Sequence, residues 1–379
     1  MAKILVLGSG MVGSAISLDL ASRHKVLATD RSAEVLKRFD GMESIETKVL
    51  DVSDSAAVKA AAAGMDLVVS AVPGFLGFAV LRTLIDAGKN VVDISFFPED
   101  ALELRALAEE RGVVVVTDIG VAPGLDNLIF GYHDAQMKVQ RFECLVGGLP
   151  KKRTFPWQYK APFSPMDVVE EYLRPARMVE NGKEVVMPAL SEPEYVEFDG
   201  IGTLEAFNTD GLRSLIQTMS HVPDMVEKTL RFPGHRDLAL AMRESGFLSD
   251  APISVQGQEV IPREVTSAIL FDQWKLHPGE EEFTVMRVTV EGAEDGKTAR
   301  HVWDLYDEYD PETGISSMSR TTGYTCTGMV ECVLDGSWNV IGLSPGEIVG
   351  RNGSVFERIL QHLAARGVTL RHETVVLND

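Results

Sequence analysis

The sequence predicts an α/β protein in which an N-terminal Rossmann-type, doubly wound parallel sheet is joined to a second, α+β region with a mixed or antiparallel sheet. Residues 1–120 alternate short apolar runs with helix-like segments, which is typical of a parallel sheet. Beyond residue 124 the segments are broken by Pro and Gly, and some alternate apolar with polar residues. At 379 residues the chain also exceeds one ordinary core, so more than one domain is expected.

The first region is expected to hold six strands joined by helices. The apolar runs predict strands at residues 3–7, 25–29, 45–49, 66–71, 90–94 and 113–117. The intervening segments predict helices at residues 12–22, 33–39, 54–62, 76–87 and 99–110. Short crossovers of this kind form right-handed βαβ units. The first run, KILVL, stops at once in a glycine turn, so we expect a buried strand and not a secretory signal peptide.

The second region begins with an expected helix and then turns to longer strands. The helix is predicted at 125–138, and strands are predicted at 139–147, 283–291 and 299–307. The last two flank the turn AEDGKT, and the first of them alternates apolar with polar residues, which indicates one face toward water. An amphipathic helix at 353–366 and a short strand at 367–371 are expected to end the chain.

Composition excludes several classes of protein. With 36 basic and 56 acidic residues the net charge is −20, which argues against nucleic acid as a partner. The sequence lacks an apolar run of the ~18–20 residues that a membrane span needs. Its three cysteines are too few and too scattered for a disulfide framework, which favours a cytoplasmic location. Neither His-x-x-x-His nor Cys-x-x-Cys occurs, so no metal site is expected.

A glycine motif follows the first strand and opens the first helix. It has the spacing G-x-G-x-x-G, and it predicts cofactor contacts from Gly8, Ser9, Gly10, Met11, Val12 and Gly13. The first glycine permits the tight turn, the second lets the backbone approach a pyrophosphate, and the third lets helix and strand pack closely. The helix N-terminus adds free N–H groups and the positive end of a dipole. A glycine turn without a ligand is the weaker alternative.

The residues after the second strand bear on the choice between NAD and NADP. Asp30 lies about 20 residues after the glycine turn, where a carboxylate accepts hydrogen bonds from the ribose hydroxyls and repels a 2′-phosphate. This favours NAD. Arg31 follows immediately and would pair with a 2′-phosphate if Asp30 turned away, so NADP stays open.

Further cofactor contacts are expected at the carboxyl ends of the other parallel strands, where open sheets of this kind bind ligands. These are Asp51, Val52, Ala71, Val72, Pro73, Val121 and Pro123. Asp93 and Ser95 follow the fifth strand, and they are expected to reach toward the nicotinamide.

Several segments resemble the saccharopine dehydrogenase-like family, and the resemblance covers nearly the whole chain. They are VTDIGVAPGLDN at 116–127, LVGGLP at 145–150, WQYKAPFSPMDVVEEYLRPARMVENGKEV at 157–185, FDGIGTLEAFNTDGL at 198–212, KTLRFPGH at 228–235 and SSMSRTTGYT at 316–325. The patterns look closest to the lysine 6-dehydrogenase branch. The resemblance implies a Rossmann domain at 1–124, an inserted substrate and dimerisation domain at 125–325, and a segment at 326–379 that returns to the Rossmann domain.

The resemblance also implies a reaction: hydride transfer between a nicotinamide and a carbon that bears nitrogen. In the lysine 6-dehydrogenase branch, NAD oxidises the carbon bearing the side-chain amine of L-lysine. Saccharopine reductases typically have an acidic residue where this chain has Ala122, and an arginine where it has Thr209. Both departures count against saccharopine and fit a smaller amino acid, with L-lysine as first choice.

Amine oxidation needs a proton acceptor, and an amino-acid substrate needs a partner for its α-carboxylate. Arg231 is the expected carboxylate partner because its planar fork suits bidentate pairing. Asp93, Asp118 and His235 are the candidate catalytic groups, and either aspartate is also suited to hold the substrate ammonium. The remaining expected substrate contacts are Ser95, Thr209, Asp210, Thr322 and Tyr324.

Two other functions stay open. One is reductive condensation of an aldehyde with an amino acid, as in the saccharopine and carboxynorspermidine branches. The other is a non-catalytic dinucleotide-binding protein, which would keep the glycine turn and need no substrate pocket. A homodimer or higher homo-oligomer is expected because an added antiparallel sheet offers an edge for pairing.

Overall fold

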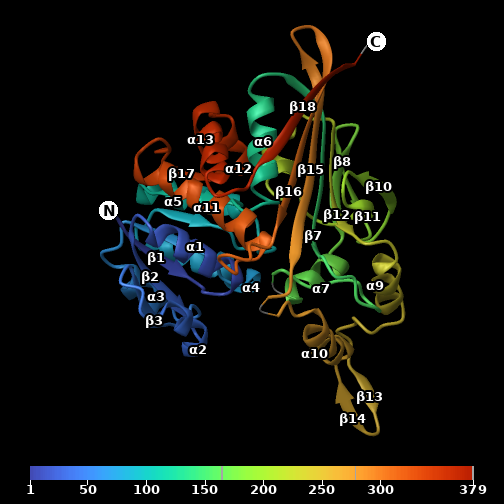
Figure 1. Ribbon diagram of the computed structural model, residues 1–379, viewed down its shortest axis with the longest axis horizontal. Coiled ribbons are helices and arrows are strands. Elements are labelled where there is room, and N and C mark those ends of the chain that lie inside the picture. The colour runs from blue at the N-terminus through green and yellow to red at the C-terminus, as the bar shows by residue number, and fades with distance from the viewer. Residues whose placement is uncertain (164, 278, 378–379) are drawn as a thin grey trace.

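The computed structural model describes residues 1–163, 165–277 and 279–377. Two sheets lie side by side, and the helices cover mainly the first of them (Figure 1). The predicted α/β class is confirmed. In the described ranges, no helix is both long enough and apolar enough to cross a bilayer.

The first sheet is parallel throughout, with the strand order β17-β6-β5-β4-β1-β2-β3. Its strands are β1 (Lys3–Leu7), β2 (Lys25–Asp30), β3 (Ile45–Val49), β4 (Leu67–Ser70), β5 (Val91–Asp93), β6 (Val114–Thr117) and β17 (Gly342–Pro345). The order reverses at β1, which is the switch point where such sheets bind ligands. The first six strands lie where the apolar runs predicted them.

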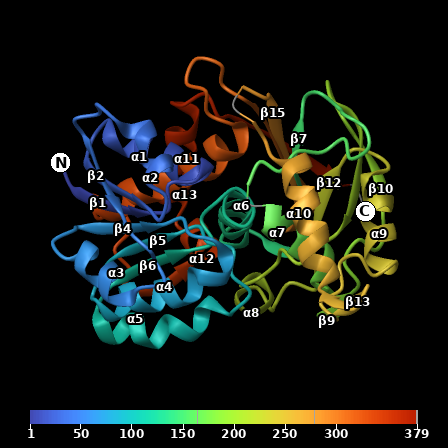
Figure 2. The same cartoon turned by 90° about the horizontal axis from the view of Figure 1, so that it is seen from below.

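Helices cover both faces of this sheet (Figure 2). One face carries α3 (Ser55–Ala62), α4 (Gly74–Asp86) and α5 (Arg105–Arg111). The other carries α1 (Met11–Ala21), α11 (Ser317–Leu334) and α13 (Gly353–Ala364). Successive side chains of a strand point to opposite faces, so Ile4 and Val6 enter one core and Leu5 and Leu7 the other. Short helical turns complete this part: α2 (Ala33–Leu36), 3₁₀ turns at Lys37–Phe39 and Ala101–Leu104, and α12 (Gly346–Gly350).

The second sheet has nine strands and is mixed, because β12 and β7 are parallel while the other pairs are antiparallel. Its strands are β7 (Lys138–Pro150), β8 (Ala176–Glu180), β9 (Lys183–Met187), β10 (Glu194–Phe198), β11 (Gly202–Asn208), β12 (Asp224–Arg231), β15 (Glu282–Glu294), β16 (Lys297–Glu308) and β18 (Leu370–Leu377). The accompanying elements are α6 (Leu125–Asp134), α7 (Pro165–Leu173), α8 (Leu215–Thr218), α9 (His235–Glu244), α10 (Pro262–Trp274) and the hairpin of β13 (Ile253–Val255) and β14 (Gln258–Val260).

The C-terminal part of the chain differs from expectation in two ways. The expected boundary at residue 325 falls inside α11, which packs along α1, and Gly323 lies where an added Cβ would be 3.3 Å from Ile16. This close approach of the two helices favours a residue without a side chain at position 323. The last strand, expected at 367–371, is β18, and it extends the second sheet by pairing with β16.

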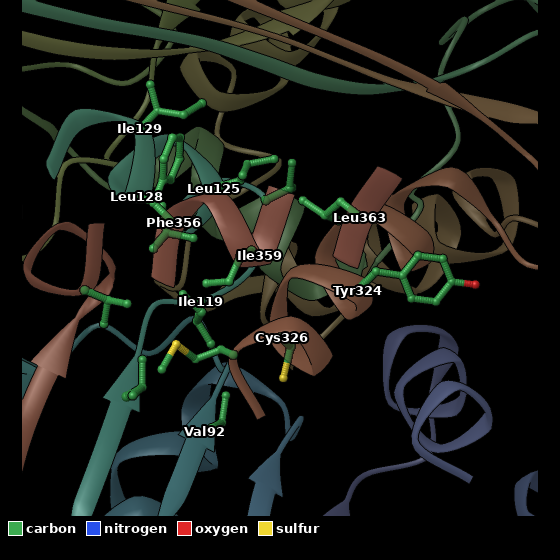
Figure 3. Close-up of a cluster of buried hydrophobic side chains, with 14 of the residues drawn as sticks. Val92, Ile119, Leu125, Leu128, Ile129, Tyr324, Cys326, Phe356, Ile359 and Leu363 are labelled. Atoms are coloured by element: carbon green, nitrogen blue, oxygen red, sulfur yellow. The ribbon is translucent and has the colours of Figure 1, made fainter. Parts of the chain in front are cut away.

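Apolar side chains from α6, α11 and α13 close over the first sheet where the two halves meet (Figure 3). Leu128 and Ile129 of α6 lie near Phe356 and Ile359 of α13, above Val92 of β5. Every one of these side chains is fully buried. The first and second halves therefore share one core, which holds the loops between them in a fixed relation.

A buried carboxyl group at the start of β15 predicts a pH dependence of stability. Glu282 is 1 % exposed and accepts a hydrogen bond from the backbone N–H of Ser317, and burial raises its pKa to about 7. When the pKa of a carboxyl group is higher in the folded than in the unfolded state, its full contribution to stability is present below the unfolded-state pKa. That contribution is lost as pH rises through the folded-state pKa. The wild type should therefore lose stability as pH rises from 5 to 8.5, while Glu282→Gln should not. Over this range the unfolding free energy of the variant should rise by up to about 3 kcal/mol relative to that of the wild type. Urea unfolding of both proteins at the two pH values measures this, and equal pH slopes would contradict it.

Candidate active site

A cavity of about 530 Å³ lies between the carboxyl ends of the first sheet and the second sheet. Its lining from the first half includes Gly8, Gly10, Met11, Val12, Gly13, Asp30, Ala71, Val72, Pro73, Ser95, Val121 and Pro123. Its lining from the second half includes Asp167, Glu171, Thr209, Asp210, Glu227, Thr229, Arg231 and Thr322. Most residues expected to contact a cofactor thus share one cavity with most of those expected to contact a substrate.

The glycine turn has the geometry that a dinucleotide requires. Gly8 has φ of +89°, and a Cβ on Gly13 would lie 2.0 Å from the carbonyl oxygen of Gly8. A Cβ on Gly10, by contrast, would meet no protein atom within 4 Å, because this residue faces the open cavity. The first and third glycines are therefore needed for packing, while the second leaves space in front of the N-terminus of α1 for a phosphate group.

Asp30 is held in position at the end of β2. Its carboxylate accepts hydrogen bonds from the backbone N–H groups of Ser9 (3.0 Å) and Ser32 (2.9 Å), and it lines the cavity. Ser9 itself is buried, and its hydroxyl donates to the carbonyl of Thr29, so it positions the turn without reaching the cavity. The structure thus fixes a carboxylate beside the expected ribose position.

Three expected cofactor contacts lie away from this cavity. Arg31, Asp51 and Val52 are absent from its described lining. The Asp51 carboxylate accepts hydrogen bonds from Ser53, and these, together with the nearby charge of Arg31, lower its pKa. Both charged side chains are exposed, and direct contact with a nucleotide stays a prediction for them.

Arg231 is the only basic side chain in the described lining of the cavity. It is 3 % exposed, and it is held by Tyr172 (Nε to Oη, 3.1 Å), by Glu171 (Nη2 to Oε2, 3.3 Å) and by its contact with the ring of Tyr159. Burial raises the pKa of Glu171 to about 7, against the opposing charge of Arg231. Because the raised pKa favours the neutral form of Glu171, the positive charge of Arg231 is suited to bind a carboxylate in the cavity.

Glu227 brings a second buried carboxyl group to the cavity. It is 6 % exposed, its Oε2 has no hydrogen-bond partner in the described chain, and it packs against Gly211. Burial raises its pKa well above the ordinary value, and the neighbouring carboxyls of Asp126 and Asp210 add to the shift. An unpartnered buried carboxyl group that lines a cavity can accept a proton from a bound ligand.

The three expected catalytic residues do not line the cavity. Asp93 is fully buried and accepts a hydrogen bond from the N–H of Ser95 (2.8 Å), and burial raises its pKa to about 7. Asp118 forms an ion pair with Arg213 (2.8 Å). The structure thus gives each aspartate a partner within the protein.

His235 is also sequestered, although it lies only four residues after Arg231. Its Nε2 is 2.8 Å from the hydroxyl of Tyr172 and its Nδ1 is 2.9 Å from the carbonyl of Trp157. It is 1 % exposed, and burial together with Arg231 lowers its pKa to about 3. It supports Tyr172, which in turn holds Arg231, and thus acts at one remove from the cavity.

The expected substrate contacts divide in the same way. Thr209, Asp210, Thr322, Ser95 and Arg231 line the cavity. Asp210 is not free to hold a cation, because Arg177 binds its two oxygens at 2.9 Å each. Tyr324 follows Thr322 by two residues on α11, so it faces another side of the helix, where Arg320 and Arg366 lie over its ring.

Sequence reasoning missed Glu171 and Glu227. Glu171 belongs to an acidic pair in an amphipathic segment, a pattern that is typical of a solvated helix face. Glu227 precedes the expected KTLRFPGH segment by one residue, and strand alternation from Arg231 was the signal that would have found it. Glu227, Thr229 and Arg231 alternate along β12 and all three line the cavity.

A Rossmann sheet whose glycine turn opens into a cavity completed by a second domain defines the class of two-domain, dinucleotide-dependent oxidoreductases. The chain belongs to the saccharopine dehydrogenase family. Residues 4–116 match the model of the saccharopine dehydrogenase NADP binding domain, and residues 120–368 match that of the saccharopine dehydrogenase C-terminal domain. The protein is therefore an NAD(P)-dependent dehydrogenase of this family.

Curated relatives agree with this assignment, and a solved structure shares the fold. The chain is 23 % identical to a saccharopine dehydrogenase [NADP(+), L-glutamate-forming] of Schizosaccharomyces pombe over 99 % of both chains. It is 29 % identical to the enzyme with the same description from Pyricularia oryzae, over 70 % of this chain and 62 % of the relative. The fold superposes on apo saccharopine dehydrogenase (L-Glu forming) from Saccharomyces cerevisiae with a TM-score of 0.80, at 21 % identity and over 99 % and 100 % of the two chains.

A homospermidine synthase from Legionella pneumophila, solved in complex with NAD, shares the fold with a TM-score of 0.65 at 10 % identity, over 98 % of this chain and 91 % of that one. None of the relatives named above is a lysine 6-dehydrogenase. The expected likeness to that branch therefore stays a prediction, while the family itself is confirmed.

Proposed function

We propose that the protein oxidises the side-chain amine of a small cationic amino acid, with L-lysine as the first-choice substrate and NAD as the preferred cofactor. The observation that carries the proposal is the uneven charge of the substrate half of the cavity. In the described lining Arg231 is the one basic group; Arg177 neutralises Asp210, while Glu227 presents a carboxyl oxygen without a hydrogen-bond partner in the described chain. One cation suits one carboxylate, and the carboxyl group of Glu227 suits a ligand that carries an additional positive charge.

The spacing of these groups fits an extended diamino acid. Glu227 and Arg231 lie four residues apart on one strand, which puts their Cα atoms about 13 Å apart. Both side chains leave the strand on the same face, so a ligand with its carboxylate on Arg231 and its amine near Glu227 would run along the strand, as an extended lysine can. Saccharopine carries further carboxylates, and Thr209 offers them a hydroxyl and no charge.

The bound nicotinamide would accept a hydride from the carbon that bears the amine. The residues of this chain have three tasks in that reaction. Arg231 binds the α-carboxylate and fixes the orientation of the substrate. Glu227 loses its proton to solvent when the cationic amine arrives, because an opposite charge nearby favours the carboxylate form. It then takes a proton from the ammonium group, which leaves the neutral amine that hydride transfer requires.

The test is the nicotinamide absorbance after L-lysine is added to the protein with NAD at mildly alkaline pH. A rise in reduced cofactor is the expected result, together with ammonia that is released when water hydrolyses the imine product to an aldehyde. A flat trace in a protein whose NAD binding has been verified would overturn the lysine assignment. L-Ornithine and L-leucine are the matched controls, because ornithine has a shorter cationic side chain and leucine has no side-chain amine.

Reductive condensation of an aldehyde with an amino acid is the second candidate. The names of the relatives favour it, because they describe glutamate-forming saccharopine dehydrogenases that use NADP(+). It predicts that NAD(P)H is consumed only when an aldehyde and an amino acid are both present, and that saccharopine reduces NAD(P). A non-catalytic dinucleotide-binding role would be favoured by tight NADH binding without turnover in either assay.

Cofactor preference rests on Asp30. Replacing it with alanine should weaken NADH binding by about 10- to 100-fold, since two charge-assisted hydrogen bonds to the ribose are lost. NADPH binding should weaken less or improve, because the carboxylate no longer repels the 2′-phosphate. Fluorescence titration of both reduced cofactors against wild type and Asp30→Ala measures this ratio. An unchanged ratio would show that Asp30 does not meet the ribose.

A further inference from the structure

Three histidines from distant parts of the chain meet outside the active-site cavity. They are His133 at the end of α6, His301 on β16 and His372 on β18, and one ring nitrogen or more from each lies within 4.8 Å of the others. We propose that this cluster binds a divalent transition-metal ion of the zinc type, which ties the C-terminal strand to α6. None of the three histidines belongs to the described lining of the active-site cavity.

The separation of two of the nitrogens matches a shared metal ligand sphere. His301 Nδ1 and His372 Nε2 lie 3.1 Å apart. Two nitrogens bound to one tetrahedral Zn²⁺ at about 2.0–2.1 Å are about 3.3 Å from each other. A metal ion can therefore replace the hydrogen bond between the two rings with little movement of either strand.

The surroundings set the protonation that metal binding needs. Glu294 Oε2 lies 3.1 Å from His301 Nε2, and a carboxylate there accepts the proton of that nitrogen. The lone pair is then on Nδ1, which faces His372. This carboxylate–histidine arrangement is the one that orients imidazole ligands in metal sites. Thr374 Oγ1, 3.1 Å from His301 Nδ1, is a further polar neighbour.

His133 supplies the third imidazole. The indole N–H of Trp303 donates to His133 Nε2 over 2.9 Å, so the lone pair of this ring is on Nε2, and a metal ion bound there would replace the indole N–H. Neutral imidazole is the form that binds metal ions.

The three histidines differ in how far they are buried. His133 and His301 are 3 % and 5 % exposed, while His372 lies on the outermost strand and is exposed. Three protein ligands leave a fourth coordination position, which a water molecule can fill from the open side. Sequence spacing did not predict the site, because its ligands come from three separate elements and not from one motif.

The test is Zn²⁺ binding to the untagged protein after dialysis against a chelator, followed with a competing colorimetric indicator. One equivalent per chain is expected, and Co²⁺ should give the visible absorption bands of a tetrahedral site. His372→Gln should weaken Zn²⁺ binding at least tenfold, and Glu294→Gln should weaken it by about 10- to 100-fold. His277→Gln is the matched control, because His277 is exposed and lies outside the cluster.

Thermal unfolding gives a second readout that does not depend on enzyme activity. Zn²⁺ should raise Tm in the wild type and in His277→Gln, and should leave it unchanged in His372→Gln. His372 is on an exposed edge strand, so this variant is expected to fold. Sub-stoichiometric binding, or equal Zn²⁺ affinity in the His372→Gln and His277→Gln variants, would overturn the proposal.

Discussion

Glu227→Gln should lower kcat for amine oxidation by about 10²- to 10⁴-fold, the range that a positioned acid–base group contributes. The glutamine keeps the size of the side chain and its contact with Gly211, but it cannot accept a proton from the substrate ammonium. NADH binding should be unchanged because Glu227 belongs to the second half of the cavity. Steady-state kinetics with L-lysine and fluorescence titration with NADH measure the two effects.

A loss of activity through misfolding is distinguishable from this result. Burial raises the pKa of Glu227, so its ionised form opposes folding as pH rises, and the variant should be at least as stable as the wild type at pH 8–9. Glu143→Gln is the matched control: it lies on the neighbouring strand β7, pairs with Arg141 at 3.1 Å and is outside the described cavity lining. Full activity in Glu227→Gln would remove this residue as the proton acceptor.

The cofactor half of the site is predictable from sequence because it is local. The strand KILVL, the glycine turn and Asp30 all lie within 28 residues, from Lys3 to Asp30. The glycine turn and Asp30 lie at the ends of two strands whose positions the apolar pattern gives. Strands β1, β2, β4, β5 and β6 could be predicted for the same reason, because a buried parallel strand is a largely apolar run. The edge strand β3, IETKV, is exposed after Ile45 and lacks this pattern.

The substrate half is not local, and this is where prediction stopped. Glu171 and Arg231 meet at 3.3 Å although 60 residues separate them. His235 has the residue type of a catalytic group and follows a turn, but its burial between Tyr172 and Trp157 depends on how α7 packs. Periodicity gives the face of an element and not the neighbour that the face will meet. The same holds for Asp118, whose partner Arg213 comes from a loop in the second half.

Variants of the glycine turn should distinguish the glycine that serves NADH binding from the glycine that serves folding. Gly10→Val should leave Tm within about 2 °C of the wild type, because a Cβ at this position meets no protein atom within 4 Å and the backbone φ of −63° lies outside the left-handed region that favours glycine. It should weaken NADH binding by at least about 100-fold, since the valine occupies the space through which the pyrophosphate approaches the backbone.

Gly13→Val is the contrasting variant. Its Cβ would lie 2.0 Å from the carbonyl oxygen of Gly8, so α1 must move away from β1, and both Tm and NADH binding should fall. Thermal unfolding and NADH titration of the two variants give four measurements. If Gly10→Val binds NADH as well as the wild type does, the nucleotide does not lie over this turn, and the position assigned to it in the cavity is wrong. If Gly10→Val loses Tm as Gly13→Val does, the second glycine serves the fold and not the ligand.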